Sequence, residues 1–404
     1  MAILCIGIMV SAVGKQNVER YFGILSLIAG KDCLGLENHA LVATSMTCIG
    51  SMVSVLGPRC LPMVPQILER ILDILETPEI DLIVAECGLD TLATFFEVLP
   101  LFITFFIPRI VKLVTRSMPE ALGSHRDELC ALIGTNTQHS ALSSHISRFV
   151  ADINQSDELF IAPLLLIIKS LMKATAPQEL MDSRNSYHNI FTALLPIQPE
   201  ATILVIQEYI VNINETAFKP FFAGLVKWGR DNPVLLQIAD MLLDTLKSLF
   251  IHHTTLIMDI LLEDVNELKL SILTKVFAYD TVEYTSQDRF EKVSAVLLKC
   301  LNDGLPVEKA LVALSTCRAD LFKTIHKPIL LSLRNDSDAV QICGIEIIKN
   351  LYEELPNMIQ FFPEQVPFLA ELLEDGSEQV QENTRELCDS IQSVLGEPIE
   401  QYFK

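Results

Sequence analysis

The sequence predicts an all-α protein, an α/α superhelix built from antiparallel helix pairs. First, one unit recurs along the chain: a helical stretch ends at a Leu-Pro or Gly-Pro pair, and a second Pro seven or eight residues later opens another apolar helix. Second, apolar residues return at steps of three and four, which is the spacing of one helix face. Third, no stretch alternates polar and apolar residues between turn signals in the way that strands do.

The recurring unit is predicted to be a helical hairpin. Its three copies are Val55–Leu75, Val98–Val114 and Glu354–Leu373. The first proline of each copy cannot continue a helix, because it lacks an N–H and clashes with the preceding turn; these are Pro58, Pro100 and Pro356. The second proline suits the first helical turn; these are Pro65, Pro108 and Pro363. Weaker copies around Pro163, Pro220 and Pro328 indicate that hairpins fill the chain as one continuous superhelix.

Individual helices follow from their apolar stripes. In the first copy the predicted buried stripe is Ile67, Leu68, Ile71, Leu72 and Leu75. Near the C-terminus, Leu333–Gln341 and Leu373–Gln381 mark turns between neighbouring hairpins, with Asp and Ser residues that can cap the next helix. The last helix places Val380, Thr384, Leu387, Ile391 and Val394 on one face and ends at Gly396 in a left-handed cap.

Two polar stretches predict breaks in this pattern. Ser117–Ser147 contains Gly123 and Gly134 together with several Ser, His and Asn residues, and we expect short helices in a looser connection there. His139 and His145 would then lie in loops. Asp182–Pro199 is expected to be a second break.

Composition limits the class of protein. Half of the 404 residues are hydrophobic, yet no uninterrupted apolar run of the required length, about 18 residues, predicts a membrane span; the longest runs are Ala2–Val13 and Ile161–Ile168. Ala2–Val13 lacks a basic leader, so we expect a buried helix there rather than a secretory signal. The 10 cysteines form no C-x-x-C pair and no Cys/His cluster, which predicts free thiols and a reducing compartment.

The charge is unevenly distributed. The net charge is -21, and from Asp336 onward fifteen acidic residues face three basic ones. Such a segment repels a phosphate backbone and attracts basic partners. General nucleic-acid binding by the whole chain is therefore not expected.

No catalytic constellation is present in the sequence. There is no phosphate-binding loop, no dinucleotide fingerprint, no nucleophile elbow and no H-E-x-x-H motif. His252 and His253 beside Asp259 are interpreted as surface residues, because neighbouring side chains on a helix point about a hundred degrees apart. Glu353, Glu354, Glu374 and Asp375 lie at predicted helix ends, where solvated carboxylates are expected. The prediction is a protein that is not an enzyme, with no cofactor, no metal and no small-molecule substrate.

Two sets of side chains are candidates for partner contact. Arg109, Lys112 and Arg116 are spaced to share one face of a hairpin's second helix, and they are the possible contact with RNA phosphates or with a partner. Arg59 and Arg70 extend this set if stacked repeats bring them near. The alternative is an ordinary solvated face, which the acidic chain favours. Aromatic side chains in the interhelix turns either close the hairpin or anchor a partner peptide; they are Phe102, Phe105, Phe106, Phe361 and Phe362.

Units of about forty residues with D-x-x-x-V at the turn resemble HEAT repeats, a variety of armadillo-like solenoid, although Gln341 and Gln381 stand where that pattern commonly has Arg. The resemblance narrows to the family of HEAT repeat-containing protein 1, the large U3 small nucleolar RNA-associated protein. The segments that carry it are Val366–Phe403, Phe218–Gly229, Ile272–Val293 and Leu56–Leu68, in the family's order. Family members are several times longer, so this chain corresponds to their C-terminal part.

The resemblance implies a nucleolar scaffold of the small-subunit processome, supporting pre-rRNA processing toward 18S rRNA and ribosomal RNA transcription. It implies processome proteins and the U3 small nucleolar ribonucleoprotein as partners, with pre-rRNA as an indirect partner reached through them, and no membrane. It also implies HEAT-like repeats at 1–120, the family's C-terminal helical region at 140–290 and further HEAT-like repeats at 291–404. The alternative is a transport receptor of the importin-β kind, which is also acidic and would bind basic cargo.

Overall fold

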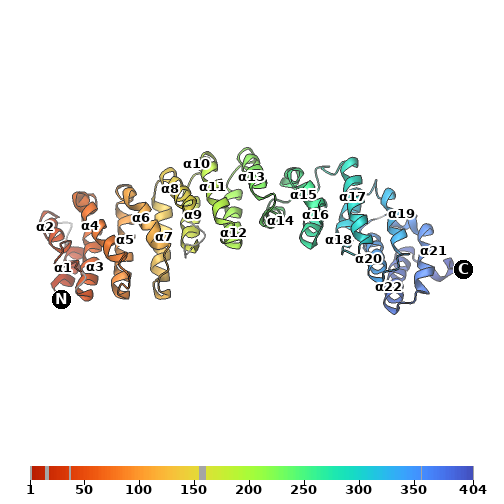
Figure 1. The fold of residues 1–404 in the computed structure, drawn as a ribbon, viewed down its shortest axis with the longest axis horizontal. Helices are drawn as coiled ribbons and strands as arrows, with labels where there is room; N and C mark the ends of the chain where they lie inside the picture. Colours follow the sequence, from red (N-terminus) through yellow and green to blue (C-terminus); the bar gives the residue numbers. More distant parts are fainter. Residues whose placement is uncertain (1, 14–17, 36–37, 154–160, 356, 404) are drawn as a thin grey trace. The chain divides into compact units, whose positions relative to one another are not determined.

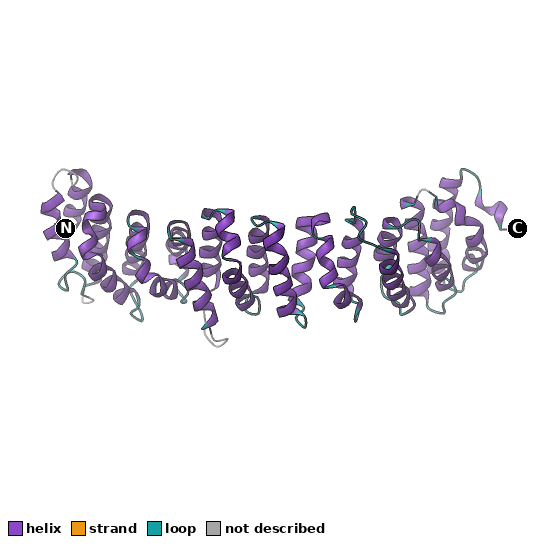
Figure 2. Ribbon diagram, turned by 90° about the horizontal axis from the view of Figure 1, so that it is seen from above, coloured by secondary structure: helices purple, strands orange, loops and turns teal. Residues whose placement is uncertain are grey.

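A computed structural model describes residues 2–13, 18–35, 38–153, 161–355 and 357–403. The regular elements in these ranges are all helices, and none of these residues lies in a strand (Figure 2). The all-α fold class is therefore confirmed. The chain divides into two compact units, Met1–Leu225 and Val226–Lys404, which are described separately.

The first unit stacks its helices in two layers (Figure 1). In one layer each helix packs on the next of the same layer, and its members are α1 (Ala2–Val13), α3 (His39–Leu56), α5 (Leu82–Val98), α7 (Gly123–Asn136), α9 (Ile161–Ala174) and α12 (Pro199–Val211). The other layer holds α4 (Val64–Leu75), α6 (Ile107–Val114), α8 (His139–Ala151) and α11 (Arg184–Leu194). Two further helices are α2 (Val18–Ile28), which packs on α3, and the short α10 (Pro177–Asp182).

The second unit repeats this arrangement. One layer contains α14 (Val234–Leu246), α16 (Glu267–Ala278), α18 (Glu308–Cys317), α20 (Asp338–Glu354) and α22 (Glu378–Leu395), each packed on the next. The other contains α15 (Met258–Leu262), α17 (Gln287–Asn302), α19 (Lys323–Ser332) and α21 (Phe362–Leu373). The boundary between the units falls inside α13 (Glu215–Gly229). The predicted division into HEAT-like repeats at 1–120, a different helical region at 140–290 and further HEAT-like repeats at 291–404 stays a prediction.

The proline pattern positions the hairpins as expected. Pro65, Pro108 and Pro363 stand in the first two positions of α4, α6 and α21. Pro58 and Pro100 lie in 3-10 turns that directly follow α3 and α5. Pro356 is outside the described residues. Because a proline costs nothing at a helix start but breaks a helix interior, these prolines fix where each helix begins.

The predicted apolar stripes form the core. The stripe of α4 is buried throughout. In α22 the stripe from Val380 to Ile391 is buried, and Gly396 ends the helix with φ +73°. The prediction that Val394 shares this buried face is wrong, because Val394 is 52% exposed in the last turn of α22. Each fully buried Leu or Ile stabilises the stack by about 1.5–3 kcal/mol.

The two predicted breaks are wrong. Most of Ser117–Ser147 lies in α7 and α8, and most of Asp182–Pro199 lies in α11. Gly134 is a packing residue: a Cβ there would lie 2.5 Å from the carbonyl oxygen of Ile167 on α9. The small and polar residues that resemble loop residues in the sequence let two helices approach closely, so they reflect contact between helices that are distant in the sequence.

Two apolar segments differ from the prediction. Ala2–Val13 is α1, a helix as expected, but the prediction that it is buried is wrong: Gly7 and Val10 are buried, whereas Leu4, Ile8, Met9 and Val13 are 43–63% exposed. Only the side of α1 that packs on α3 is covered. Among the described residues, one helical run, His39–Leu75, is long and apolar enough to cross a membrane. The sequence predicts no run of this length. It comprises α3, a 3-10 turn and α4, and 56% of its most apolar window is buried inside the protein. A buried core helix meets the same criterion, so the signal is weak.

Candidate partner-binding site

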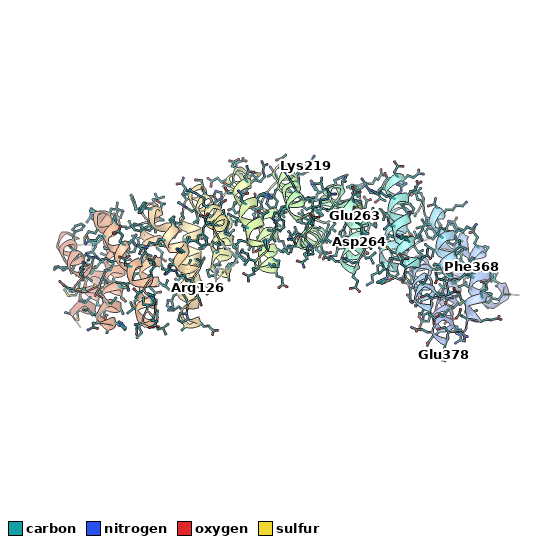
Figure 3. All side chains as sticks on the ribbon, viewed as in Figure 1. Arg126, Lys219, Glu263, Asp264, Phe368 and Glu378 are labelled. Atoms are coloured by element: carbon teal, nitrogen blue, oxygen red, sulfur yellow. The ribbon has the colours of Figure 1, made fainter. Side chains whose placement is uncertain are left out.

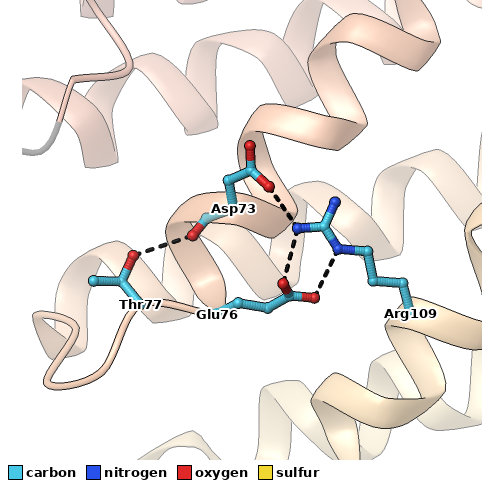
Figure 4. A network of polar contacts seen from close by, with 4 residues as sticks. All are labelled: Asp73, Glu76, Thr77 and Arg109. Carbon is cyan, nitrogen blue, oxygen red and sulfur yellow. Dashed lines mark hydrogen bonds and ion pairs between the residues drawn. The ribbon is translucent and has the colours of Figure 1, made fainter.

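Arg109 is held in an ion-pair network rather than presented to solvent (Figure 4). Its Nε and Nη2 donate to the two carboxylate oxygens of Glu76 at 2.8 Å each, and Nη2 also donates to Asp73 Oδ1 at 2.5 Å. Glu76 and Asp73 belong to the preceding hairpin. The hydrogen bond from Arg109 lowers the pKa of Glu76, and the same bond raises the pKa of Arg109. Arg109 therefore fastens α6 to α4.

The other predicted basic residues lie on separate elements. Lys112 is exposed on α6, whereas Arg116 lies beyond the end of α6, in the turn before α7. Arg70 donates to the backbone carbonyl of Ala29, and Arg59 is exposed in the turn between α3 and α4. The structure thus leaves Lys112 and Arg116 accessible while Arg109 and Arg70 are engaged. Contact of the predicted set with RNA or a partner stays a prediction.

Ion pairs one repeat apart recur in both units. They join residues separated by 31 to 39 positions: Arg109 with Asp73 and Glu76, Lys169 with Glu208, Lys275 with Asp240 and Asp244, Lys292 with Asp259, Arg334 with Glu371, and Lys349 with Glu386. Most partners are partly exposed, so each pair is worth about 0.2–1 kcal/mol. Their common spacing nevertheless fixes the register of neighbouring hairpins.

Gln341, an uncharged residue, also links neighbouring repeats, through hydrogen bonds instead of an ion pair. Its Nε2 donates to the Leu333 carbonyl and to Asp375 Oδ2 in the next turn, both at 3.3 Å. Gln381 bonds the Asp375 carbonyl at 2.7 Å. The residues that replace Arg in the HEAT pattern therefore still tie the turn to its helix. Ser337 and Ser377, predicted to cap, make no side-chain cap bond; instead Asn335 and Asp375 accept from their N–H groups.

The C-terminal repeats present an acidic surface. Two of the three basic residues after Asp336 are engaged, Lys349 with Glu386 and Arg385 with Gln381, and the third, Lys404, is outside the described residues. The exposed carboxylates of α20, α22 and the turn between hairpins include Glu353, Glu354, Glu374, Glu378, Glu382 and Asp389. Figure 3 labels Glu378 on the first turn of α22 and Phe368, whose ring lies 4.3 Å from the Arg334 guanidinium.

The aromatic residues of the turns divide into two kinds. Phe106 and Phe362 are buried and close their hairpins, and Phe361 is half-buried against the His326 ring at 4.6 Å. Phe102 and Phe105 are 54% and 84% exposed. The hairpin-closing interpretation is therefore confirmed for Phe106 and Phe362 and is wrong for Phe102 and Phe105.

Three histidines predicted for loops or the surface are buried or helical. His139 is buried at the start of α8 and hydrogen-bonded with the Tyr187 hydroxyl at 3.1 Å, and His145 lies within α8. His253 is buried, because the 3-10 turn Ile251–Leu256 directs it inward, while His252 is exposed. Asp259 pairs with Lys292 instead of either histidine. Across the described ranges, no three metal-ligating side chains gather into a group.

Helix pairs stacked with one-repeat links and exposed outer faces define this chain as a HEAT-type helical solenoid. The crystal structure of Kap121p bound to Ste12p shares the fold, with a TM-score of 0.50 at 12% identity over 94% of this chain and 42% of that one. No family model matches the chain.

Curated proteins resemble the chain along nearly its whole length. U3 small nucleolar RNA-associated protein 10 of Schizosaccharomyces pombe is 25% identical over 98% of the chain, and HEAT repeat-containing protein 1 of Homo sapiens is 22% identical over 96%. The resemblance expected from the sequence is confirmed. The chain spans about a quarter of the length of these relatives, 27% and 22%.

Proposed function

We propose that this chain is a non-enzymatic scaffold of the small-subunit processome in the nucleolus, supporting pre-rRNA processing toward 18S rRNA and ribosomal RNA transcription. One observation carries the proposal: the chain matches U3 small nucleolar RNA-associated protein 10 and HEAT repeat-containing protein 1 along 96–98% of its length. Its partners are then processome proteins and the U3 small nucleolar ribonucleoprotein.

The geometry supplies a mechanism for such a scaffold. Most apolar side chains of the helices are buried between neighbouring hairpins. The outer helix faces are therefore available for partners. The acidic surface of α20 and α22 suits basic, unstructured extensions of assembly factors, because opposite charges steer association and select partners. Binding is distributed over many contacts and needs no enclosed site.

Direct RNA contact, if present, rests on few residues. Arg109 is neutralised by Glu76 and Asp73, so the predicted basic set reduces to Lys112 and Arg116. Neither has an aromatic neighbour in sequence on which a base would stack. We therefore propose that pre-rRNA is reached mainly through protein partners. Replacing Lys112 and Arg116 by Glu should leave salt-sensitive RNA retention unchanged, and a marked loss would establish direct binding.

Proximity labelling with the tagged chain in cells, combined with sedimentation of cell extracts, tests the scaffold proposal. We expect enrichment of processome subunits and cosedimentation with large pre-ribosomal particles. A variant with Glu353, Glu354, Glu382 and Asp389 changed to Lys should lose part of this enrichment. The matched control changes four exposed carboxylates of the first unit, Glu69, Glu97, Glu120 and Glu200, to Lys.

The outcome also separates the scaffold from a transport receptor. Enrichment of nuclear-pore components, with cargo released on addition of a small GTPase, would replace the scaffold proposal by the importin-β-like alternative. Equal behaviour of the two charge variants would remove the acidic surface from the mechanism.

A further inference from the structure

A groove of about 360 Å³ lies between two consecutive inter-hairpin turns of the first unit. One wall is the turn that follows α4 together with the start of α5, and the other is the turn that follows α6. Its floor is formed by buried apolar side chains, Leu75, Ala85, Leu89, Leu113 and Leu122. The volume falls in the range of about 300–1,000 Å³ that is usual for ligand sites.

The groove opens onto more apolar surface. Leu82, which lines it, is 42% exposed, and the next residue, Ile83, is 62% exposed. The buried residues of the lining carry no polar side chain that would orient a polar small molecule. An apolar floor that continues into exposed apolar surface suits a side chain of a protein segment, which buries its anchor and leaves its backbone at the rim.

Three charged residues line the rim, and they differ in availability. Glu76 accepts two hydrogen bonds from Arg109, which also pairs with Asp73, and the charge of Arg116 helps to lower the pKa of Glu76. Arg116 and Glu79 come from opposite walls, and both are exposed. The wall formed by the turn after α6 therefore favours a carboxylate at the mouth of the groove.

We propose that this groove binds a short segment of a partner protein that presents one large apolar side chain next to an acidic residue. The apolar side chain enters between the two turns, and the acidic residue pairs with Arg116. This inference deepens the proposed scaffold function, on which it rests, by assigning a docking site and a partner chemistry. It also assigns Arg116 of the predicted basic set to a protein partner instead of RNA.

Fluorescence anisotropy with the purified full chain tests the proposal. The probes are labelled, capped Gly/Ser peptides of equal length that carry Leu-Glu, Leu-Lys or Ala-Glu at the centre. We expect saturable binding of the Leu-Glu peptide that is stronger than for either other probe. Arg116→Glu should weaken Leu-Glu binding about tenfold and reverse the preference toward Leu-Lys, because an attraction becomes a repulsion. Arg59→Glu, which changes an exposed arginine in a turn inside a hairpin, is the matched control.

Methyl NMR of the methionines locates the bound peptide. Met118 lines the groove, whereas Met63 lies in the turn between α3 and α4. We expect the Met118 methyl signal to shift with the Leu-Glu peptide and the Met63 signal to stay in place. Any of four results would overturn the site. These are no saturable binding of the Leu-Glu peptide, equal effects of Arg116→Glu and Arg59→Glu, a Met118 signal that does not shift, and displacement of the peptide by single-stranded RNA. Processome enrichment in cells is read separately, so the scaffold proposal can survive that failure.

Discussion

Replacing Gly134 by Ala should destabilise the first unit, although the same change usually stabilises a helix. In α7 a Cβ at position 134 would lie 2.5 Å from the Ile167 carbonyl oxygen, 2.6 Å from the Ser170 Cβ and 2.8 Å from the Leu171 nitrogen. Ordinary contacts begin near 3.4 Å, so α9 must retreat by about 1 Å. Two of the three atoms are helix backbone, which cannot rotate away.

The expected magnitude is a difference of two effects. Ala gains about 1 kcal/mol over Gly in helix propensity. Overpacking costs about 1–3 kcal/mol, and the rigid backbone of α9 places this case at the upper end. The net loss should be about 1–2 kcal/mol. Gly123→Ala is the matched control, because Gly123 lies in the same helix with no atom within 4 Å of its added Cβ, and this variant should be as stable as the parent or more so.

Urea unfolding followed by circular dichroism gives the stability, and amide hydrogen exchange gives its location. Because a repeat array can unfold in parts, exchange in peptides covering α7 and α9 is the sharper measurement. We expect faster exchange in both helices for Gly134→Ala only. If the two alanine variants have equal midpoints and equal exchange, the close approach of α7 and α9 is refuted.

Further predictions concern the links, the histidines and one loop. Arg109→Ala should lower the free energy of unfolding in urea by about 1–2 kcal/mol, because it leaves Glu76 half-buried without its partner. The control Lys112→Ala should change this free energy little, since Lys112 is exposed. Equal losses in the two variants would contradict the role of Arg109 as a link between α6 and α4. Burial lowers the pKa of His139 and His326 below the usual 6.5, so their neutral forms stabilise the fold fully above about pH 6.5, and stability should fall as pH drops below it. Unfolding midpoints at pH 8 and pH 5.5 measure this, and replacing both residues by Gln should reduce the difference; burial also lowers the pKa of His145 and His188, which contribute the rest. The Asp280 carboxylate accepts hydrogen bonds from the N–H groups of Val282, Tyr284 and Thr285. Asp280→Ala should therefore speed amide hydrogen exchange in residues 280–286 and leave exchange in α20 unchanged. Unchanged exchange in residues 280–286 would show that Asp280 does not hold this loop.

Site predictions from the sequence were limited by what local spacing can indicate. The periodicity placed Arg109 on the polar face of α6, yet its partners Asp73 and Glu76 lie a whole repeat earlier. A one-repeat spacing between opposite charges was the signal that could have revealed this pair. The groove beside Arg116 had no such signal, because two turns from different hairpins form its walls.

The sequence by itself determined the helical hairpins, their start points and their family resemblance. Prolines act on the adjacent residues and apolar stripes act within one helix, so both signals are local. Only the tertiary structure decided that Ser117–Ser147 is packed helix, that His139 is buried and that Arg109 is a link between repeats. Each of these depends on atoms more than thirty positions away, because in a stacked array a residue's environment is provided by the neighbouring repeat.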